Sequence, residues 1–152
     1  MTGQDEQNHE NCEKVEFGSI SVNLSYSEID EKLTSPSDVK SRYNHLKEKP
    51  KEYFYAVFLR ADNSVIGDKL IGAGDPSNVA TDIGDIVRTA SVTNAQAVIL
   101  VHNHPSLKSG ATEADVEVTK EVEEVLQLLG IDLLDHLIIA EPVYSMKQHG
   151  DL

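Results

Sequence analysis

The sequence predicts an α/β fold, a single domain with a mixed central β-sheet flanked by helices. Residues 97–101 (AVILV) are apolar on both faces, as a buried central strand is, and residues 131–141 (IDLLDHLIIAE) predict another buried strand. Segments with one apolar stripe at helical spacing come before and between these strands. A chain of 152 residues that is 39% hydrophobic and 26% charged is long enough for one domain with its own core. Alternating helices and strands then indicate an α/β architecture.

The first 20 residues differ in composition from the rest of the chain. They are polar and acidic with little apolar periodicity, so we expect residues 1–20 to be disordered and residues 21–152 to form the domain. Such a start is typical of neither a signal peptide nor a transit peptide. Residues 19–33 (SISVNLSYSEIDEKL) alternate enough to predict a short edge strand.

Residues 35–48 (SPSDVKSRYNHLKE) predict the first helix. Ser35 and Asp38 have the spacing of a capping box, and the apolar residues that follow fall on one face. Two strands are expected next, over residues 52–60 and 65–74, because both segments are rich in apolar and branched residues and the turn ADNS separates them.

The second half of the chain alternates helix and strand. An Asp-Pro pair beginning at Asp75 predicts the start of a helix that continues towards residue 95. Another helix, over residues 112–129, carries valines and leucines on one side and stops at Gly130. The two buried strands follow these helices, and residues 143–146 (VYSM) predict a last short strand.

The charge balance bears on the partners and the location. Thirteen Lys and Arg against 26 Asp and Glu give a formal net charge of −13, which makes nucleic-acid binding an unfavourable hypothesis. No apolar run is long enough to predict a membrane helix. Cys12 is the one cysteine, so a disulfide within the chain and a cysteine-only zinc site are excluded. We therefore expect a cytoplasmic protein.

The stretch VHNHPSLKSGATEAD, residues 101–115, is the strongest functional signal. Residues two apart in a strand point to the same side, so His102 and His104 project together if the strand from Ala97 reaches them. Pro105 cannot continue a central ladder, which places both rings where the strand opens into a loop. Asp115, in the first turn of the next helix, completes a set of two imidazoles and one carboxylate. Such a set is typical of catalytic zinc with one position left for water.

Other interpretations of these residues stay open. The two histidines also suit polar positions at a strand end. Thr112 and Asp115 have the spacing of a capping box, in which the carboxylate would reach a backbone N–H and would not be a ligand. His136 lies in a buried-looking strand, where a hydrogen-bonded core histidine is favoured over a fourth metal ligand.

The chain resembles the JAB/MPN metalloprotease superfamily at these positions. His102, any residue, His104, seven residues, Thr112, two residues and Asp115 follow the JAMM signature, with Thr in place of the usual Ser. The blocks LVHNHPS and LLGIDLLDHLIIAE resemble the RadC-like JAB domain more closely, and the likeness covers residues 34–145. It implies a single JAB/MPN domain, similar to the cytidine-deaminase fold.

The resemblance also implies roles for individual residues. His102, His104 and Asp115 would hold one Zn²⁺ per chain, Glu52 would act as general base and then acid, and the Thr112 hydroxyl would hold the oxyanion. The implied reaction is hydrolysis of a peptide or isopeptide bond, with a peptide or a ubiquitin-like protein as substrate. The alternative is a non-catalytic JAB-type binding or scaffold module linked to DNA repair or mobile-element biology. The substrate and the oligomeric state stay open.

The loop after the histidines departs from the RadC-like pattern. Leu107 replaces the usual glycine after His-Pro-Ser, and Ala111 replaces the usual proline. We therefore expect a differently shaped loop, with consequences for substrate selection more than for metal binding. We also expect Ser106 and Asn103 to line the cleft, with Asn103 tying down the loop backbone.

Two other enzyme classes are excluded by sequence. In HNH nucleases the His, Asn and His are spread over a ββα unit, whereas here they are contiguous, and the acidic charge opposes DNA binding. Zinc-dependent nucleobase deaminases need a Pro-Cys-x-x-Cys motif, which a chain with a single cysteine cannot supply.

Overall fold

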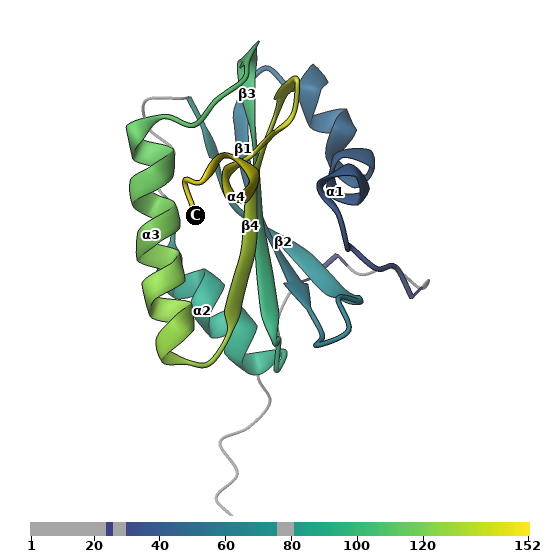
Figure 1. The fold of residues 1–152 in the computed structure, drawn as a ribbon, viewed down its shortest axis with the longest axis vertical. Helices are drawn as coiled ribbons and strands as arrows, with labels where there is room; N and C mark the ends of the chain where they lie inside the picture. Colours follow the sequence, from purple (N-terminus) through teal and green to yellow (C-terminus); the bar gives the residue numbers. More distant parts are fainter. Residues whose placement is uncertain (1–23, 26–29, 76–80) are drawn as a thin grey trace, which may run out of the picture.

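The computed structural model describes residues 24–25, 30–75 and 81–152 and has a five-stranded sheet in the order β2-β1-β3-β4-β5 (Figure 1). Strands β3 and β4 run parallel, and the other neighbouring pairs are antiparallel. The predicted mixed sheet flanked by helices is thereby confirmed. The strands are β1 (Glu52–Leu59), β2 (Val65–Gly74), β3 (Ala97–Lys108), β4 (Asp132–Glu141) and β5 (Tyr144–Ser145). The helices are α1 (Pro36–Tyr43), the 3-10 helix η1 (Asn44–Glu48), α2 (Ile83–Val92), α3 (Glu113–Leu128) and α4 (Met146–His149).

Helix α1 lies on one side of the sheet, and α2 and α3 lie on the other (Figure 1). The central strands β1 and β3 alternate between two buried clusters, so their apolar residues supply both faces at once. Val57 and Val101 pack in the cluster on the α1 side, whereas Ala56 and Leu100 pack with residues of α2 and α3. This explains why residues 97–101 are apolar at every position.

Helix α1 begins as the sequence predicts. The Ser35 hydroxyl accepts from the Asp38 N–H at 3.3 Å, and the Asp38 carboxylate accepts from the Ser35 N–H at 3.0 Å. These two bonds form the expected capping box. The helix gives way to η1 after Tyr43, which shortens the α-helical part of the predicted segment.

The start of α2 corrects the prediction from the Asp-Pro pair at residue 75. The helix begins at Ile83, because the Asp82 side chain accepts from the Asp85 N–H at 2.9 Å and so supplies the N-cap. Residues 76–80 lie outside the described residues. The same holds for the predicted disordered segment 1–20 and for most of the predicted edge strand.

Ser25 and Lys32 are the described positions of that expected edge strand where bridges form. Ser25 pairs with Asp68 and Lys32 pairs with Ser64, both as isolated antiparallel bridges. At the other end of the chain, VYSM forms the two-residue strand β5 and then begins α4 at Met146. Across the described part of the chain, no helix is both long and apolar enough to cross a membrane.

A cluster of polar side chains links α1 to β2 on the α1 side of the sheet. The Asp68 carboxylate accepts from the Tyr43 hydroxyl at 2.5 Å and from the Arg42 guanidinium at 3.1 Å. Arg42 also pairs with Glu31. We call Glu31, Arg42, Tyr43 and Asp68 the Arg42 cluster. Burial, together with the neighbouring Asp68 charge, raises the pKa of Tyr43, so its hydroxyl stays protonated and donates.

Candidate metal centre

Strand β3 carries both histidines past the end of its regular pairing. Its ladder with β1 ends at Phe54 and His102, and its ladder with β4 runs to Asn103 before a register shift. The strand itself continues to Lys108, so the predicted opening into a loop at Pro105 is wrong. The ladder is nevertheless interrupted there, since Pro105 has no N–H to donate.

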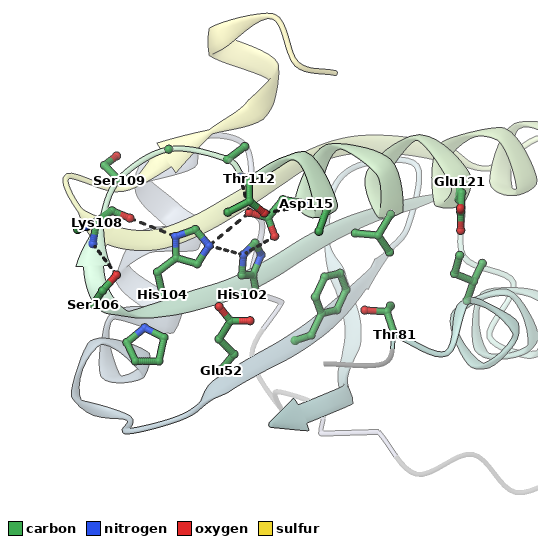
Figure 2. Close-up of a pocket in the computed structure, with 17 residues that line it drawn as sticks. Glu52, Thr81, His102, His104, Ser106, Lys108, Ser109, Thr112, Asp115 and Glu121 are labelled. Atoms are coloured by element: carbon green, nitrogen blue, oxygen red, sulfur yellow. Dashed lines mark hydrogen bonds and ion pairs between the residues drawn. The ribbon is translucent and has the colours of Figure 1, made fainter. Parts of the chain in front are cut away.

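The structure brings His102, His104 and Asp115 together on the α3 side of β3 (Figure 2). The two Nε2 atoms lie 3.0 Å apart. Asp115 Oδ1 lies 3.2 Å from His102 Nε2, and Asp115 Oδ2 lies 3.3 Å from His104 Nε2. We call these three residues the His-His-Asp group.

The spacing of these donor atoms fits zinc. With metal–nitrogen bonds of 2.0–2.1 Å, two ligand atoms at adjacent corners of a tetrahedron lie roughly 3.3 Å apart. The 3.0 Å between the two Nε2 atoms is close to that value, and so are the 3.2 and 3.3 Å that separate each Nε2 from one oxygen of Asp115. Two imidazole nitrogens and one carboxylate oxygen are also a donor set that zinc accepts. The group is therefore suited to hold a divalent ion at three corners.

Asp115 caps α3 and also lies in the group that could hold a metal ion, the two positions that the sequence analysis treated as competing. Its Oδ2 accepts from the Thr112 N–H at 2.8 Å, and the Thr112 hydroxyl oxygen accepts from the Asp115 N–H at 3.2 Å. This capping box starts α3. A carboxylate has about four lone-pair sites, so the cap leaves sites on both oxygens for an ion. The expected conflict between the two interpretations is therefore absent, since the capping carboxylate also faces both imidazoles.

The His104 ring is oriented by the last residue of β3. Its Nδ1 lies 3.1 Å from the Lys108 carbonyl oxygen, which only accepts, so Nδ1 carries the proton and the Nε2 of the neutral ring keeps its lone pair. A hydrogen bond with Asp115 raises the pKa of His104, against the opposing effect of burial. Burial acts to raise the pKa of Asp115, but hydrogen bonds with His102 and His104 hold it far below its ordinary value.

His136 contacts the back of His102, a contact that the sequence analysis did not foresee. The His136 ring is completely buried, and its Nε2 lies 2.7 Å from His102 Nδ1. On its other side, His136 Nδ1 lies 2.6 Å from the Thr119 hydroxyl of α3. Burial first, and the adjacent His102 second, lower the pKa of His136 well below its ordinary value, so this ring is neutral. The residue is thus a hydrogen-bonded core histidine outside the His-His-Asp group.

Glu52 and Thr112 line the same cavity as the His-His-Asp group. The cavity has a volume of about 510 Å³. Glu52 is the first residue of β1, and its half-buried side chain points towards the two imidazoles (Figure 2). The pKa of Glu52 is raised above its ordinary value, with burial as the largest cause. The charges of the nearby histidines oppose this rise, and the charge of Asp115 adds to it. The Thr112 hydroxyl accepts the capping bond, which leaves its proton free to donate into the cavity.

Asn103 does not line the cavity, which corrects that prediction. Its side chain points to the opposite face from its neighbours, as strand alternation requires. There the Asn103 Oδ1 accepts from the Tyr53 N–H at 2.7 Å, and its Nδ2 donates to the Lys51 carbonyl at 2.9 Å. These bonds hold the backbone on both sides of Glu52. Asn103 therefore fixes the start of β1 and not the loop after the histidines.

Ser106 lines the cavity, as the sequence analysis predicted. Its hydroxyl oxygen lies 3.4 Å from the Lys108 N–H. Between them, Leu107 has a φ of +58°, a left-handed conformation that favours glycine. The backbone thus has the conformation that a glycine adopts readily, although the sequence has a leucine there. A shape that differs from that of the relatives stays a prediction.

The rest of the cavity wall is largely apolar beside the metal donors. Phe54 of β1, Ile83 of α2, and Ala114 and Val118 of α3 contribute apolar side chains to it. Glu121 lies farther along α3 (Figure 2). Phe54 also stacks on the His102 ring with 5.7 Å between centroids. An apolar wall next to polar donors is the usual composition of a small-molecule or side-chain binding site.

Comparisons with known proteins identify the family to which this chain is similar. A model of the RadC-like JAB domain matches residues 33–151. A UPF0758 protein of Methanosarcina mazei is 33% identical over 121 residues, which cover 78% of this chain and 53% of the relative. A UPF0758 protein of Rubrobacter xylanophilus is 35% identical over 121 residues, covering 79% of this chain and 53% of the relative.

A third relative extends the same pattern. A UPF0758 protein of Carboxydothermus hydrogenoformans is 36% identical over 118 residues, covering 74% of this chain and 51% of the relative. The chain thus spans about half the length of the curated relatives it matches. The matched region contains every residue of the candidate metal centre, and on this evidence the chain belongs to the family of RadC-like JAB domains.

Proposed function

We propose that this chain is a zinc-dependent hydrolase of JAMM type that cleaves the amide bond of a peptide or an isopeptide. The observation that carries the proposal is the convergence of three donor atoms with a separate carboxylate, Glu52, in one cavity. A structural metal site would use its carboxylates as ligands. Here one carboxylate is placed among the ligands and another stands opposite them, which is the arrangement that hydrolysis requires.

Each residue has a distinct task in this reaction. His102, His104 and Asp115 would hold the ion, which when bound polarises a carbonyl and lowers the pKa of a bound water towards ~7. Glu52 takes the proton of the attacking water and passes it to the leaving nitrogen. Its raised pKa suits this exchange, because a carboxyl that titrates closer to neutrality both accepts and returns a proton. The Thr112 hydroxyl donates to the oxyanion.

The cavity indicates what the substrate presents next to the scissile bond. Its apolar wall of Phe54, Ile83 and Val118 accommodates an aliphatic side chain or stem. A peptide or a ubiquitin-like protein joined through an isopeptide bond supplies such a group beside an amide.

The test compares Glu52→Gln with His104→Ala. Zinc content and cleavage of fluorogenic peptide amides and isopeptide conjugates are measured for each purified protein. Glu52→Gln keeps zinc and loses turnover by about 10²–10⁴-fold, the usual contribution of a general base. His104→Ala loses both zinc and turnover, because two donors cannot retain the ion.

Matched controls separate these effects from changes of net charge. Glu117→Gln, on the exposed face of α3, and His45→Ala, on the exposed side of η1, keep zinc and turnover. Equal turnover in Glu52→Gln and wild type rules out Glu52 as the base. A wild-type protein that binds one zinc and cleaves none of these substrates would instead favour the binding-module alternative.

A further inference from the structure

A chain of three short contacts runs from the back of His102 into the domain. His102 Nδ1 lies 2.7 Å from His136 Nε2, and His136 Nδ1 lies 2.6 Å from the Thr119 hydroxyl oxygen. That oxygen lies 2.5 Å from the backbone carbonyl oxygen of Asp115, one helical turn earlier in α3. His136 and Thr119 are both 0% exposed, so water does not compete for these bonds.

The Asp115 carbonyl, at the end of this series of contacts, determines which atom donates in each hydrogen bond. A carbonyl oxygen only accepts, so the Thr119 hydroxyl must place its proton between itself and the Asp115 carbonyl. The one other partner of this hydroxyl, the Met146 sulfur at 3.5 Å, is also an acceptor. The Thr119 oxygen therefore accepts from His136 Nδ1–H. A neutral imidazole has one protonated nitrogen, so His136 Nε2 carries a lone pair and accepts from His102 Nδ1–H.

We propose that His136 and Thr119 are positioning residues that fix His102 in the tautomer whose Nε2 lone pair faces the cavity. The inference deepens the proposed function, on which it rests, by assigning two residues behind a ligand. Histidine ligands of metals are usually held through the other ring nitrogen by a carboxylate, a backbone carbonyl or water. His104 follows that rule through Lys108. His102 uses a second imidazole, whose own tautomer is fixed by Thr119.

The arrangement also couples two ligands through the core. The series of hydrogen bonds starts at the His102 side chain and ends at the Asp115 backbone. The Thr119 hydroxyl, which orients His102 through His136, therefore also bonds to the first turn of α3, the helix that carries Asp115. A buried network that is fully satisfied holds its members in one geometry. No buried side-chain nitrogen or oxygen in the described part of the chain lacks a partner.

The direct test is the tautomer of His102 in the metal-free protein. Long-range ¹H–¹⁵N correlation spectra are recorded on the full chain at about pH 9, well above the ordinary histidine pKa of about 6.5, so that the rings are neutral. We expect His102 and His136 each to show a protonated Nδ1 and an unprotonated Nε2. A His102 ring with a protonated Nε2, or one that averages between the two tautomers, overturns the proposal.

The variant Thr119→Val removes the hydroxyl while keeping the shape of the side chain. His136 Nδ1–H then has no acceptor, so the ring changes to the Nε2–H tautomer and donates to His102. The His102 proton moves to Nε2, where it blocks the metal position. We expect this tautomer change in the spectra and a loss of zinc affinity of about 10–100-fold in a chelator competition. Thr119→Ser, which keeps the hydroxyl, retains the wild-type tautomer and affinity.

The outcomes distinguish this proposal from the proposed function. Wild-type tautomer and zinc affinity in Thr119→Val, with the fold intact by near-ultraviolet circular dichroism, overturn the positioning role alone. A wild-type protein that binds no zinc but shows the expected His102 tautomer overturns the proposed function and leaves the positioning role standing. His136→Leu is a weaker test, because it removes a completely buried polar ring and also destabilises the core.

Discussion

The His-His-Asp group and the Arg42 cluster lie on opposite faces of one sheet and are built in opposite ways. In the Arg42 cluster every acceptor faces a donor, since the Asp68 and Glu31 carboxylates receive the protons of Tyr43 and Arg42. In the His-His-Asp group, the two Nε2 atoms, which are acceptors when the rings are neutral, lie 3.0 Å apart, and each lies within 3.3 Å of one oxygen of the Asp115 carboxylate. Lone pairs at this separation repel unless a proton or a cation stands between them.

This difference in hydrogen-bond partners indicates that the Arg42 cluster is structural and that the His-His-Asp group is a candidate binding site. The Arg42 cluster is complete in its own side chains and has no need of a ligand. In the His-His-Asp group, His104 Nδ1 meets a carbonyl oxygen and Asp115 Oδ2 accepts from an N–H, but both Nε2 atoms face only each other and the carboxylate. These facing atoms are the ones that could hold a metal ion.

The largest expected effect is the stabilisation of the domain by zinc, and it depends on pH. Free zinc at about 1,000 times the dissociation constant should raise the free energy of unfolding by about 4 kcal/mol. The raised pKa of His104 means that, without metal, its pairing with Asp115 stabilises the fold at low pH and is lost as the pH rises through that pKa. The increment from zinc therefore grows from about pH 6 to about pH 9.

Urea unfolding with zinc and with a chelator, at both pH values, measures this increment. The low pKa of Asp115 keeps its carboxylate charged throughout this range, so it does not reverse the trend. An increment that is the same at both values, or larger at the lower one, would contradict the assignment of His104 as a ligand.

The sequence predicted the residues of the His-His-Asp group, because their placement depends on short-range spacing. Strand alternation places His102 and His104 on one side, and the capping spacing places Asp115 at the start of α3, so the group follows from local geometry. Glu52 was found through the resemblance alone, because a strand that begins 50 residues earlier meets His102 only through sheet pairing.

The positions that the sequence did not reveal depend on tertiary contacts. His136 lies 34 residues from His102, and Thr119 lies 17 residues from His136. Their meeting requires β4 to pair with β3 and α3 to pack across them, which no local periodicity encodes. The signal that was present is a histidine inside the apolar run DHLIIAE, where a buried polar ring must have partners.

A smaller effect is expected from Asp68→Asn, which breaks the other cluster. The substitution weakens the acceptor for Tyr43 and Arg42, although Glu31 still faces Arg42. Removing a charged acceptor of this kind should lower the free energy of unfolding by roughly 2 kcal/mol in urea titrations. Zinc affinity should not change, because the cluster lies on the other side of the sheet.

Asp132→Asn, at the exposed start of β4, is the matched control and should change the free energy of unfolding by less than about 0.5 kcal/mol. Loss of zinc binding in a folded Asp68→Asn protein would show that the Arg42 cluster and the His-His-Asp group are coupled and not independent.

The smallest expected effect concerns Leu107, near the end of β3 beside the His-His-Asp group. Leu107 has a φ of +58°, a conformation that costs an L-residue roughly 1–2 kcal/mol and costs glycine nothing sterically. Glycine also gains entropy in the unfolded chain, which offsets part of the relief. Leu107→Gly and Leu107→Ala both remove the leucine side chain. The two proteins then differ mainly in the free-energy cost of the left-handed backbone conformation. The glycine protein should be more stable by about 1 kcal/mol in urea unfolding.

The same pair of variants shows whether the loop conformation matters to the metal site. Lys108, which follows Leu107, supplies the carbonyl that fixes the His104 ring. If Leu107 keeps its left-handed conformation in the alanine protein, that carbonyl stays in place and both variants bind zinc as wild type does. Weaker zinc binding in Leu107→Ala alone would mean that the loop relaxes and releases His104. In that case the alanine protein would gain stability and lose zinc affinity, which would mean that the strained conformation of Leu107 is needed to hold the metal site.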